Sequence, residues 1–198
     1  RLKLEELFYV QLRLLMMKIS RMEAYPGIRF NNSEMLNKYY NDHLPFELTG
    51  AQKRVIKEAY TDFRSGKQMN RLIQGDVGSG KTMVAFLCML IAIGNGTQCA
   101  FMAPTEILAD QHFNNLKEQA KPLGIRVAKL TGSSKQSERK ALDIALKAGE
   151  IHILVGTHAL LEDKVKFDKL GLAIIDEQHR FGVAQRAKLW SKNKSTYP

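Results

Sequence analysis

The chain has 198 residues, of which 44% are hydrophobic, and its formal net charge is +10. That length suits one α/β domain with a short appendage, and the hydrophobic share is enough for a core, so the composition argues against a disordered chain. The basic excess favours a polyanionic partner such as nucleic acid, because Lys and Arg that neutralise phosphates release condensed counterions. A solvated basic surface explains the charge equally well.

The cysteine content and the apolar runs narrow the class of protein further. Cys88 and Cys99 are the two cysteines and do not form a C-x-x-C pair, which disfavours a disulfide framework or a zinc site and fits a reduced, cytoplasmic compartment. The longest apolar run, residues 84–93, is too short to span a bilayer, so no membrane partner is expected. The chain starts without Met or a signal-peptide pattern and ends abruptly, so we expect a fragment of a longer protein.

Residues 1–43 are expected to form a helical arm without a phosphate-binding signature. Apolar residues recur at spacings of three and four over residues 1–24, which predicts an amphipathic helix that the Tyr-Pro-Gly sequence at 25–27 ends. Asn32 or Ser33 is expected to cap a second short helix that continues to Tyr40. The arm is expected to pack against the following domain or to connect it to a segment upstream. The apolar positions of the first helix are Leu4, Phe8, Leu12, Leu15, Ile19 and Met22.

Helices and apolar strands alternate from residue 48 onward. After a helix at 50–64, a strand at 71–74 is expected to lead into a glycine-rich loop, and a helix is expected to leave that loop. Strands that alternate with helices of this length predict a mainly parallel sheet with helices on both faces, and residues 44–198 are assigned to this one α/β domain. Further strands are expected at 98–102, 126–130, 152–155 and 172–175, and further helices at 106–121 and 136–148.

Residues 75–82 read Gly-Asp-Val-Gly-Ser-Gly-Lys-Thr and match the G-x-x-x-x-G-K-[ST] phosphate loop. Lys81 is expected to reach the β- and γ-phosphates of a nucleoside triphosphate, and the Thr82 hydroxyl is expected to ligate Mg²⁺. An ordinary glycine-rich turn is the alternative, and the complete pattern between a strand and a helix argues against it. The expected ATP-binding residues of this loop are Gly75, Gly78, Ser79, Gly80, Lys81 and Thr82.

Asp176 and Glu177 follow an apolar strand, and open α/β sheets bind their ligands at the carboxyl ends of such strands. Asp176 is expected to bind the same Mg²⁺, directly or through water. Glu177 is expected to orient the attacking water and accept its proton, so that Lys81, Asp176 and Glu177 form the expected catalytic set. A helix N-cap pair is the alternative for the two acids. Glu177 argues against a small-molecule kinase, because a kinase must exclude water.

A family resemblance is carried by residues 75–82, 104–112, 156–161 and 176–183, and by the preceding segment 44–52. These segments resemble the first motor lobe of the bacterial RecG branched-DNA helicases, which are superfamily 2 ATPases. The resemblance implies a RecA-like P-loop NTPase fold with ATP and Mg²⁺ as cofactors. It also implies that the whole protein unwinds and branch-migrates forks and Holliday junctions in DNA recombination and repair, in the bacterial cytoplasm.

The family pattern implies two parts that this chain does not supply. One is a second motor lobe with an arginine finger, and the other is an N-terminal wedge domain that recognises branched DNA, so the isolated lobe is expected to hydrolyse ATP very slowly. Transcription-repair coupling translocases have a similar motor, but they usually carry Phe where this chain has Ser79, and Asp-Glu-Glu-Gln at 176–179. Both positions favour the RecG type, a PriA-type motor is a more distant match, and a non-motor ATP-binding switch is the alternative from another class.

The resemblance also implies how the adenine is recognised. Gln52 would bind the adenine edge, with Phe46 as a possible stacking neighbour. Thr49 and Gln52 also fit a capping box, in which Gln52 folds back onto the backbone N–H of Thr49. The two uses compete for one side chain, and the sequence leaves both adenine recognition and the capping box open.

Hydroxyl-bearing loops follow three of the expected strands and would track a DNA backbone without reading its sequence. Thr105 opens one of them, and a plain helix N-cap is the alternative for that residue. Gln178 and His179 follow the two acids and, as in the family, would couple the nucleotide state to DNA contact, whereas a lone His is often only structural. The expected DNA-binding and coupling residues are Thr105, Thr131, Gly132, Thr157, Gln178 and His179.

Overall fold

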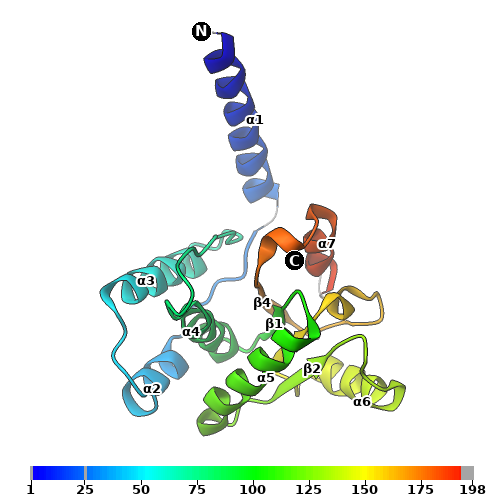
Figure 1. Ribbon diagram of the computed structural model, residues 1–198. Coiled ribbons are helices and arrows are strands. Elements are labelled where there is room, and N and C mark those ends of the chain that lie inside the picture. The colour runs from blue at the N-terminus through cyan, green and yellow to red at the C-terminus, as the bar shows by residue number, and fades with distance from the viewer. Residues whose placement is uncertain (1, 25, 193–198) are drawn as a thin grey trace.

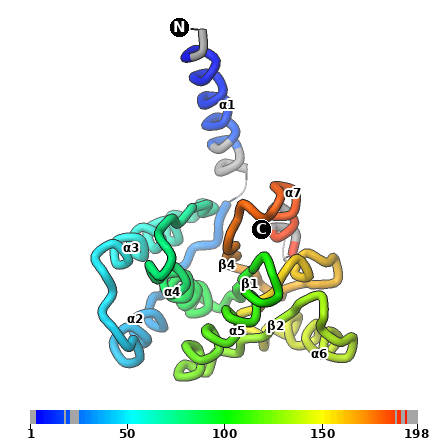
Figure 2. Tube along the Cα trace, viewed as in Figure 1, coloured from blue at the N-terminus to red at the C-terminus, as the bar shows by residue number. Residues whose placement is uncertain are grey.

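The computed structural model describes residues 2–24 and 26–192, and its chain path is drawn in Figures 1 and 2. Within them a four-stranded sheet has the order β2-β3-β1-β4, and each of its pairings is parallel. The expected mainly parallel α/β fold is confirmed. Tyr25 and the last six residues of the expected domain, 193–198, lie outside the described residues. The strands are β1 (Gln98–Met102), β2 (Val127–Leu130), β3 (Ile153–Gly156) and β4 (Leu170–Ile175).

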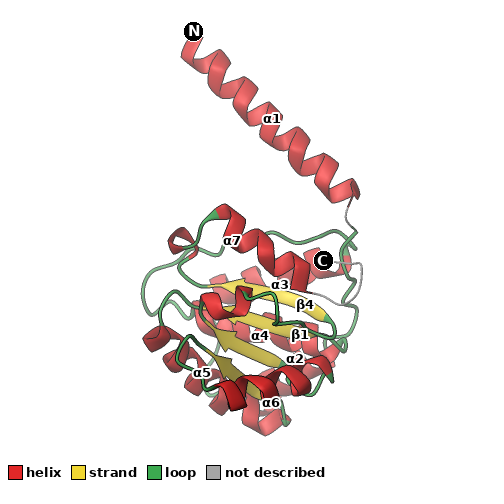
Figure 3. Cartoon of the chain, turned by 90° about the vertical axis from the view of Figure 1, so that its right-hand side faces the viewer, coloured by secondary structure: helices red, strands yellow, loops and turns green. Residues whose placement is uncertain are grey.

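Helices cover both faces of this sheet, as Figure 3 shows. Successive side chains of a strand point to opposite faces, so the apolar strands place hydrophobic residues on both faces of the sheet. Cys99 and Phe101 of β1 face a core that contains α4 (Lys81–Gly94) and α5 (Glu106–Ala120). Ala100 and Met102 face a second core that contains Leu146 of α6 (Gln136–Lys147). Every residue of β1 is buried, so both faces of the central strand contribute to the free energy of folding.

The helix α4 is buried along nearly its whole length, which explains its uniformly apolar sequence. Residues 83–93 are buried between the sheet and two further helices, α2 (Glu34–Asp42) and α3 (Gly50–Arg64). A helix that is apolar on all sides needs such a surrounding. The remaining short helices are η1 (Lys121–Leu123), η2 (His158–Leu161), η3 (Gln178–Arg180), α7 (Val183–Lys188) and η4 (Leu189–Lys192).

Residues 71–74 do not form the strand that the sequence predicts. They have no regular structure, and Leu72 is 61% exposed. Arg71 turns instead to α3, where its guanidinium pairs with Glu58 at 2.7 Å and with Asp62 at 2.8 Å. A strand is stable only where a neighbour satisfies its backbone groups, and among the described residues β4, at the edge of the sheet, pairs with β1 alone.

The N-terminal arm divides into two parts with different environments. Its second part belongs to the main core, since Phe30 and Tyr39 are each 2% exposed and the Tyr39 ring meets Phe86 of α4 edge-on at 5.1 Å. The first part, α1 (Leu2–Ala24), projects away from the sheet (Figure 1). Its described apolar side chains, from Leu4 at 72% to Leu12 at 42%, are exposed, so the second part of the arm packs on the domain and this helix does not. The side chain of Met22 lies outside the described residues.

Among the described residues, none of the helices combines the length and the apolar character that crossing a membrane requires.

Candidate nucleotide and nucleic-acid site

The phosphate loop ends at the N-terminus of α4. Gly78 and Gly80 have φ of +80° and +77°, in the left-handed region that a side chain disfavours. Gly80 is the N-cap, so Lys81 and Thr82 form the first turn of the helix. The free backbone N–H groups of a helix N-terminus and the positive end of its dipole attract anions. The loop and the helix therefore form a site suited to phosphate.

The Lys81 ammonium lies against this loop. Its Nζ donates to the carbonyl oxygens of Gly75 at 2.6 Å and Asp76 at 2.7 Å. The loop is closed further by the backbone N–H of Ser79, which donates to the Asp76 carbonyl at 3.2 Å. The positive charge of Lys81 is thus held beside the N-terminus of α4. There the ammonium could also donate a hydrogen bond to a phosphate oxygen of a nucleotide.

Asp176 stands at the carboxyl end of β4 and continues the parallel pairing, because its N–H donates to the Met102 carbonyl at 2.9 Å. Its Oδ2 lies 2.9 Å from Nε2 of His112, and its Oδ1 accepts from the N–H of Glu177 at 3.0 Å. The His112 hydrogen bond is the main cause that lowers the pKa of Asp176, and the charge of Lys81 also lowers it. Asp176 directly follows β4, and β4 contacts α4, the helix that the phosphate loop precedes.

Glu177 has a strained backbone. Its φ is +47°, and it is the one residue other than glycine with a positive φ in the described part of the chain. Such strain costs of order 1–3 kcal/mol and clusters at active sites. The side chain is about half exposed, and its Oε2 lies 3.4 Å from Nδ1 of His179. The turn therefore presents the carboxylate to solvent next to Asp176.

The residues present fit a nucleotide-bound Mg²⁺. That ion prefers hard oxygen ligands and is usually held by one or two protein groups together with phosphates and water. Thr82 supplies a hydroxyl from the first turn of α4, and Asp176 supplies an ionised carboxylate. Within residues 2–24 and 26–192 no group of three or more His, Cys, Asp or Glu side chains could hold a metal ion.

Gln52 uses both ends of its amide. Its Oε1 accepts from the N–H of Thr49 at 2.9 Å, and Oγ1 of Thr49 accepts from the N–H of Gln52 at 3.3 Å, so the capping box is formed. Its Nε2 donates to the Ser79 carbonyl at 2.9 Å, which fastens α3 to the phosphate loop. Phe46 is 50% exposed. The adenine role of Gln52 and Phe46 stays a prediction.

The loop after β1 is tied to the loop after β2. Thr105 is the N-cap of α5 and its Oγ1 accepts from the N–H of Leu108 at 3.3 Å, so the capping alternative is realised. The carboxylate of Glu106 accepts from the N–H of Ser133 at 3.1 Å and from its hydroxyl at 2.8 Å. These bonds lower the pKa of Glu106. Gly132, next to Ser133, is exposed.

Two of the expected DNA-contacting hydroxyls are buried in this structure. Thr131 is 3% exposed, and its Oγ1 lies 3.0 Å from Oγ of Ser133. Thr157 is 2% exposed, and its Oγ1 has no hydrogen-bond partner among the described atoms. Both side chains sit where strands end, as the sequence predicts, but their hydroxyls cannot reach a DNA phosphate in this conformation. Next to Thr131, Gly132 and Ser133 are exposed to solvent.

Gln178 and His179 form the short helix η3 directly after the acids, and both are exposed. The carbonyl of Gln178 accepts from the guanidinium of Arg186 at 3.1 Å. Their coupling role stays a prediction.

The loops at the carboxyl ends of the strands, here called the rim, are held together by two residues that the sequence pattern does not reveal, His112 and Arg139. His112 lies in one of the segments that carry the resemblance, but its partner is 64 residues away. Arg139 donates from Nη1 to both carboxylate oxygens of Glu162 at 2.9 Å, and from Nη2 to the carbonyls of Thr131 at 2.6 Å and Gly132 at 3.2 Å. A helical arginine gives no sequence signal for such contacts, because they depend on where the loops lie.

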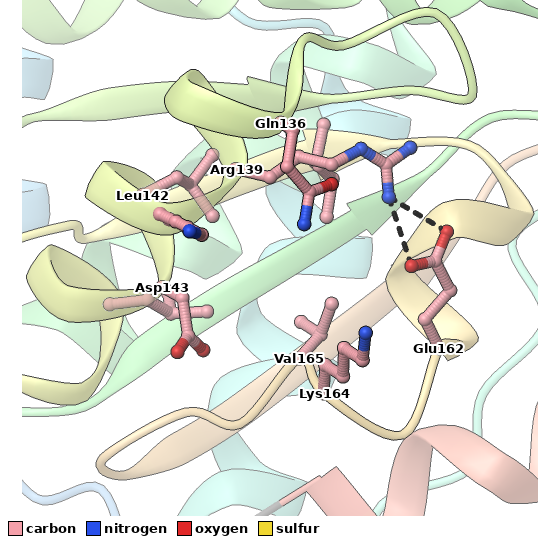
Figure 4. Close-up of a pocket in the computed structure, with 10 residues that line it drawn as sticks. Gln136, Arg139, Leu142, Asp143, Glu162, Lys164 and Val165 are labelled. Atoms are coloured by element: carbon pink, nitrogen blue, oxygen red, sulfur yellow. Dashed lines mark hydrogen bonds and ion pairs between the residues drawn. The ribbon is translucent and has the colours of Figure 1, made fainter.

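A separate hollow lies between α6 and the segment after η2 (Figure 4). Arg139 and Glu162 face each other at one end of it, Asp143 lies at the other end, and Lys164 lies beside Val165 between them. None of the residues expected to bind ATP or DNA lines this hollow.

The comparisons with known proteins agree with this geometry. A family model described as DEAD/DEAH box helicase matches residues 49–197. The ATP-dependent DNA helicase RecG of Aquifex aeolicus (strain VF5) is 50% identical over 194 residues, which are 98% of this chain and 24% of that protein. That of Bacillus subtilis (strain 168) is 49% identical over 192 residues, which are 96% of this chain and 28% of that protein. The chain thus spans about a quarter of the length of the curated relatives it matches.

Two solved structures define the fold. The structure of RecG bound to a three-way DNA junction superposes with a TM-score of 0.83 at 46% identity, and the match covers 90% of this chain and 24% of that one. The yeast DEAD-box splicing factor Prp28 superposes with a TM-score of 0.63 at 16% identity, covers 87% of this chain and 44% of that one, and supports the fold alone. Since the family model covers most of the chain, including the phosphate loop and the acids that follow β4, this chain belongs to the DEAD/DEAH box helicase family.

Proposed function

We propose that this chain is the first motor lobe of an ATP-dependent DNA helicase that unwinds and branch-migrates forks and Holliday junctions in DNA recombination and repair. The observation that carries the proposal is the phosphate loop at the N-terminus of α4, combined with the two acids that directly follow β4, a strand that α4 contacts. The relative bound to a three-way DNA junction supports branched DNA as the substrate.

In this proposal each residue of the pocket has a chemical role. Lys81 and the N-terminus of α4 bind the phosphate oxygens of ATP, and Gln52 and Phe46 recognise its base. Thr82 and Asp176 hold Mg²⁺, which supplies charge stabilisation for the transferred phosphoryl group. Glu177 orients the attacking water and accepts its proton, a contribution of typically about 10²–10⁴ in rate.

The proposal also covers the domain organisation, the DNA contacts and the cellular compartment. Residues 44–198 would be the lobe and residues 1–43 an arm that leads into it, with a second motor lobe and a wedge domain elsewhere in the same protein. Thr105, Gly132 and Ser133 would meet the DNA backbone, and Gln178 and His179 would report the nucleotide state. The activity would belong to the bacterial cytoplasm, at the nucleoid, and the two buried, free cysteines are compatible with a reducing compartment.

The test uses the full-length protein and a labelled DNA fork. Lys81→Ala is expected to lose ATP binding and strand separation, whereas Glu177→Gln is expected to bind ATP but to lose strand separation because hydrolysis falls by about 10²–10⁴. Lys57→Ala and Glu118→Gln, at exposed positions of α3 and α5, are the matched controls.

Two outcomes would contradict the proposal. A Glu177→Gln protein that keeps the ATP-dependent output would indicate a nucleotide switch rather than a motor. Binding to RNA polymerase without a preference for forks over linear duplex would indicate a transcription-repair coupling translocase. The 198-residue chain by itself is expected to hydrolyse ATP very slowly, because an arginine finger contributes about 10³–10⁵ in rate.

A further inference from the structure

The contact between His112 and Asp176 joins two segments that the sequence does not connect. His112 lies in the second turn of α5, its side chain is 14% exposed, and Nε2 is 2.9 Å from Oδ2 of Asp176. The imidazole ring rests on Phe101 of β1, with the ring centroids 4.5 Å apart. The ring is therefore held by packing on one side and by the carboxylate on the other.

The direction of this hydrogen bond follows from the chemistry of the two groups. An aspartate side chain is ionised at neutral pH, and an ionised carboxylate only accepts hydrogen bonds. His112 is therefore the donor through Nε2–H. The other oxygen, Oδ1, accepts from the N–H of Glu177 at 3.0 Å. With one donor on each oxygen the carboxylate cannot rotate freely, yet each oxygen keeps a lone pair for a cation or a water.

The helix that carries His112 is anchored at its start to another loop. Glu106, in the first turn of α5, binds the N–H and the hydroxyl of Ser133 in the loop after β2. Glu106 and His112 are six residues apart on one helix, which corresponds to about 9 Å along its axis. The helix α5 therefore connects the loop at Ser133 to the Asp176 carboxylate.

We propose that His112 is a positioning residue: it fixes the carboxylate of Asp176 for Mg²⁺, and through α5 it links that carboxylate to the loop at Ser133. The inference rests on the proposed ATP-dependent motor function. Partners that orient metal-binding groups in this way typically contribute about 10–100-fold to metal affinity. His112 itself does not touch the nucleotide.

The experiment measures how the binding of a fluorescent ADP analogue to the full-length protein depends on Mg²⁺. His112→Leu keeps an apolar contact with Phe101 and removes the donor. This variant is expected to need about 10–100-fold more Mg²⁺ to reach half of the Mg²⁺-dependent increase in ADP binding, which is the midpoint of the titration. Its ADP affinity measured in EDTA is expected to change less than about twofold. His112→Gln, whose amide nitrogen reaches the Nε2 position, is expected to restore most of the Mg²⁺ dependence. Glu106→Gln is expected to shift the midpoint in the same direction by a smaller factor, and Glu118→Gln on the same helix is the control.

A purely structural role predicts a different pattern. Equal losses of ADP affinity with and without Mg²⁺, or a Gln variant that behaves like the Leu variant, would overturn the proposal, and so would a midpoint shift below about threefold. If His112→Leu does not fold, His112→Asn replaces it, because its shorter amide does not reach Oδ2. A wild-type protein without any Mg²⁺-dependent nucleotide binding would instead refute the proposed function itself.

Discussion

The two ends of the Gln52 amide allow capping and phosphate-loop support to be separated by mutation. Oε1 closes the capping box with Thr49, while Nε2 donates to the Ser79 carbonyl at 2.9 Å. Glu is the usual capping-box partner, so Gln52→Glu keeps the acceptor and loses only the donor. Thr49→Ala has the opposite effect, because it removes the cap and leaves the amide bond to the loop.

The expected magnitudes follow from these contacts. Thr49→Ala is expected to lower the free energy of unfolding by about 1 kcal/mol, the usual cost of losing an N-cap side chain, and to leave ATP affinity within about twofold. Gln52→Glu is expected to lower the free energy of unfolding by about 0.5–1.5 kcal/mol, the net contribution of the one hydrogen bond that is lost. It is expected to weaken ATP binding by about tenfold or more, because a carboxylate then faces a carbonyl oxygen and the phosphates.

Urea denaturation gives the free energies, and titration with a fluorescent ATP analogue gives the affinities. The reasoning would be refuted if Gln52→Glu bound ATP as tightly as the wild type, or if Thr49→Ala weakened ATP binding as much as Gln52→Glu. A selective loss for adenine over guanine nucleotides in Gln52→Ala would add support for base recognition. Equal losses for both bases would restrict Gln52 to supporting the loop.

Three further predictions concern the rim and the core. Arg139→Met is expected to lower the free energy of unfolding by about 2–3 kcal/mol in urea, because loop carbonyls and Glu162 lose charged donors, and a loss below about 0.5 kcal/mol would contradict the network. The pKa of Glu106 is lowered in the folded state, so its contribution to stability is present above the unfolded pKa of about 4.3 and is lost as pH falls through the folded pKa. In Glu106→Gln the free energy of unfolding should therefore decrease less steeply as the pH is lowered through this range. Burial raises the pKa of Cys88 to about 12 and that of Cys99 further, so neither thiol should react with iodoacetamide at pH 8 until the protein unfolds.

Local sequence determined the parts of this protein whose cause is local. The phosphate loop, its glycines with positive φ and the helix that leaves it could be recognised from residues 75–94 by themselves. The parallel strands were visible as apolar runs between helices, and the start of β1 and the bounds of α3 were predicted to the residue. The capping box at Thr49 was also visible, because its partners are three residues apart.

The tertiary structure alone decided the contacts between distant segments. Residues 71–74 have a strand-like sequence but pair with none of the strands that the structure describes, and α1 has a helical pattern but does not pack on the domain. Thr131 and Thr157 end strands as expected, yet the chain around them buries their hydroxyls. The bond from His112 to Asp176 spans 64 residues, and only the packing of α5 on the sheet brings its ends together. A sequence pattern encodes what a segment can form, whereas burial and pairing depend on what the rest of the fold places beside it.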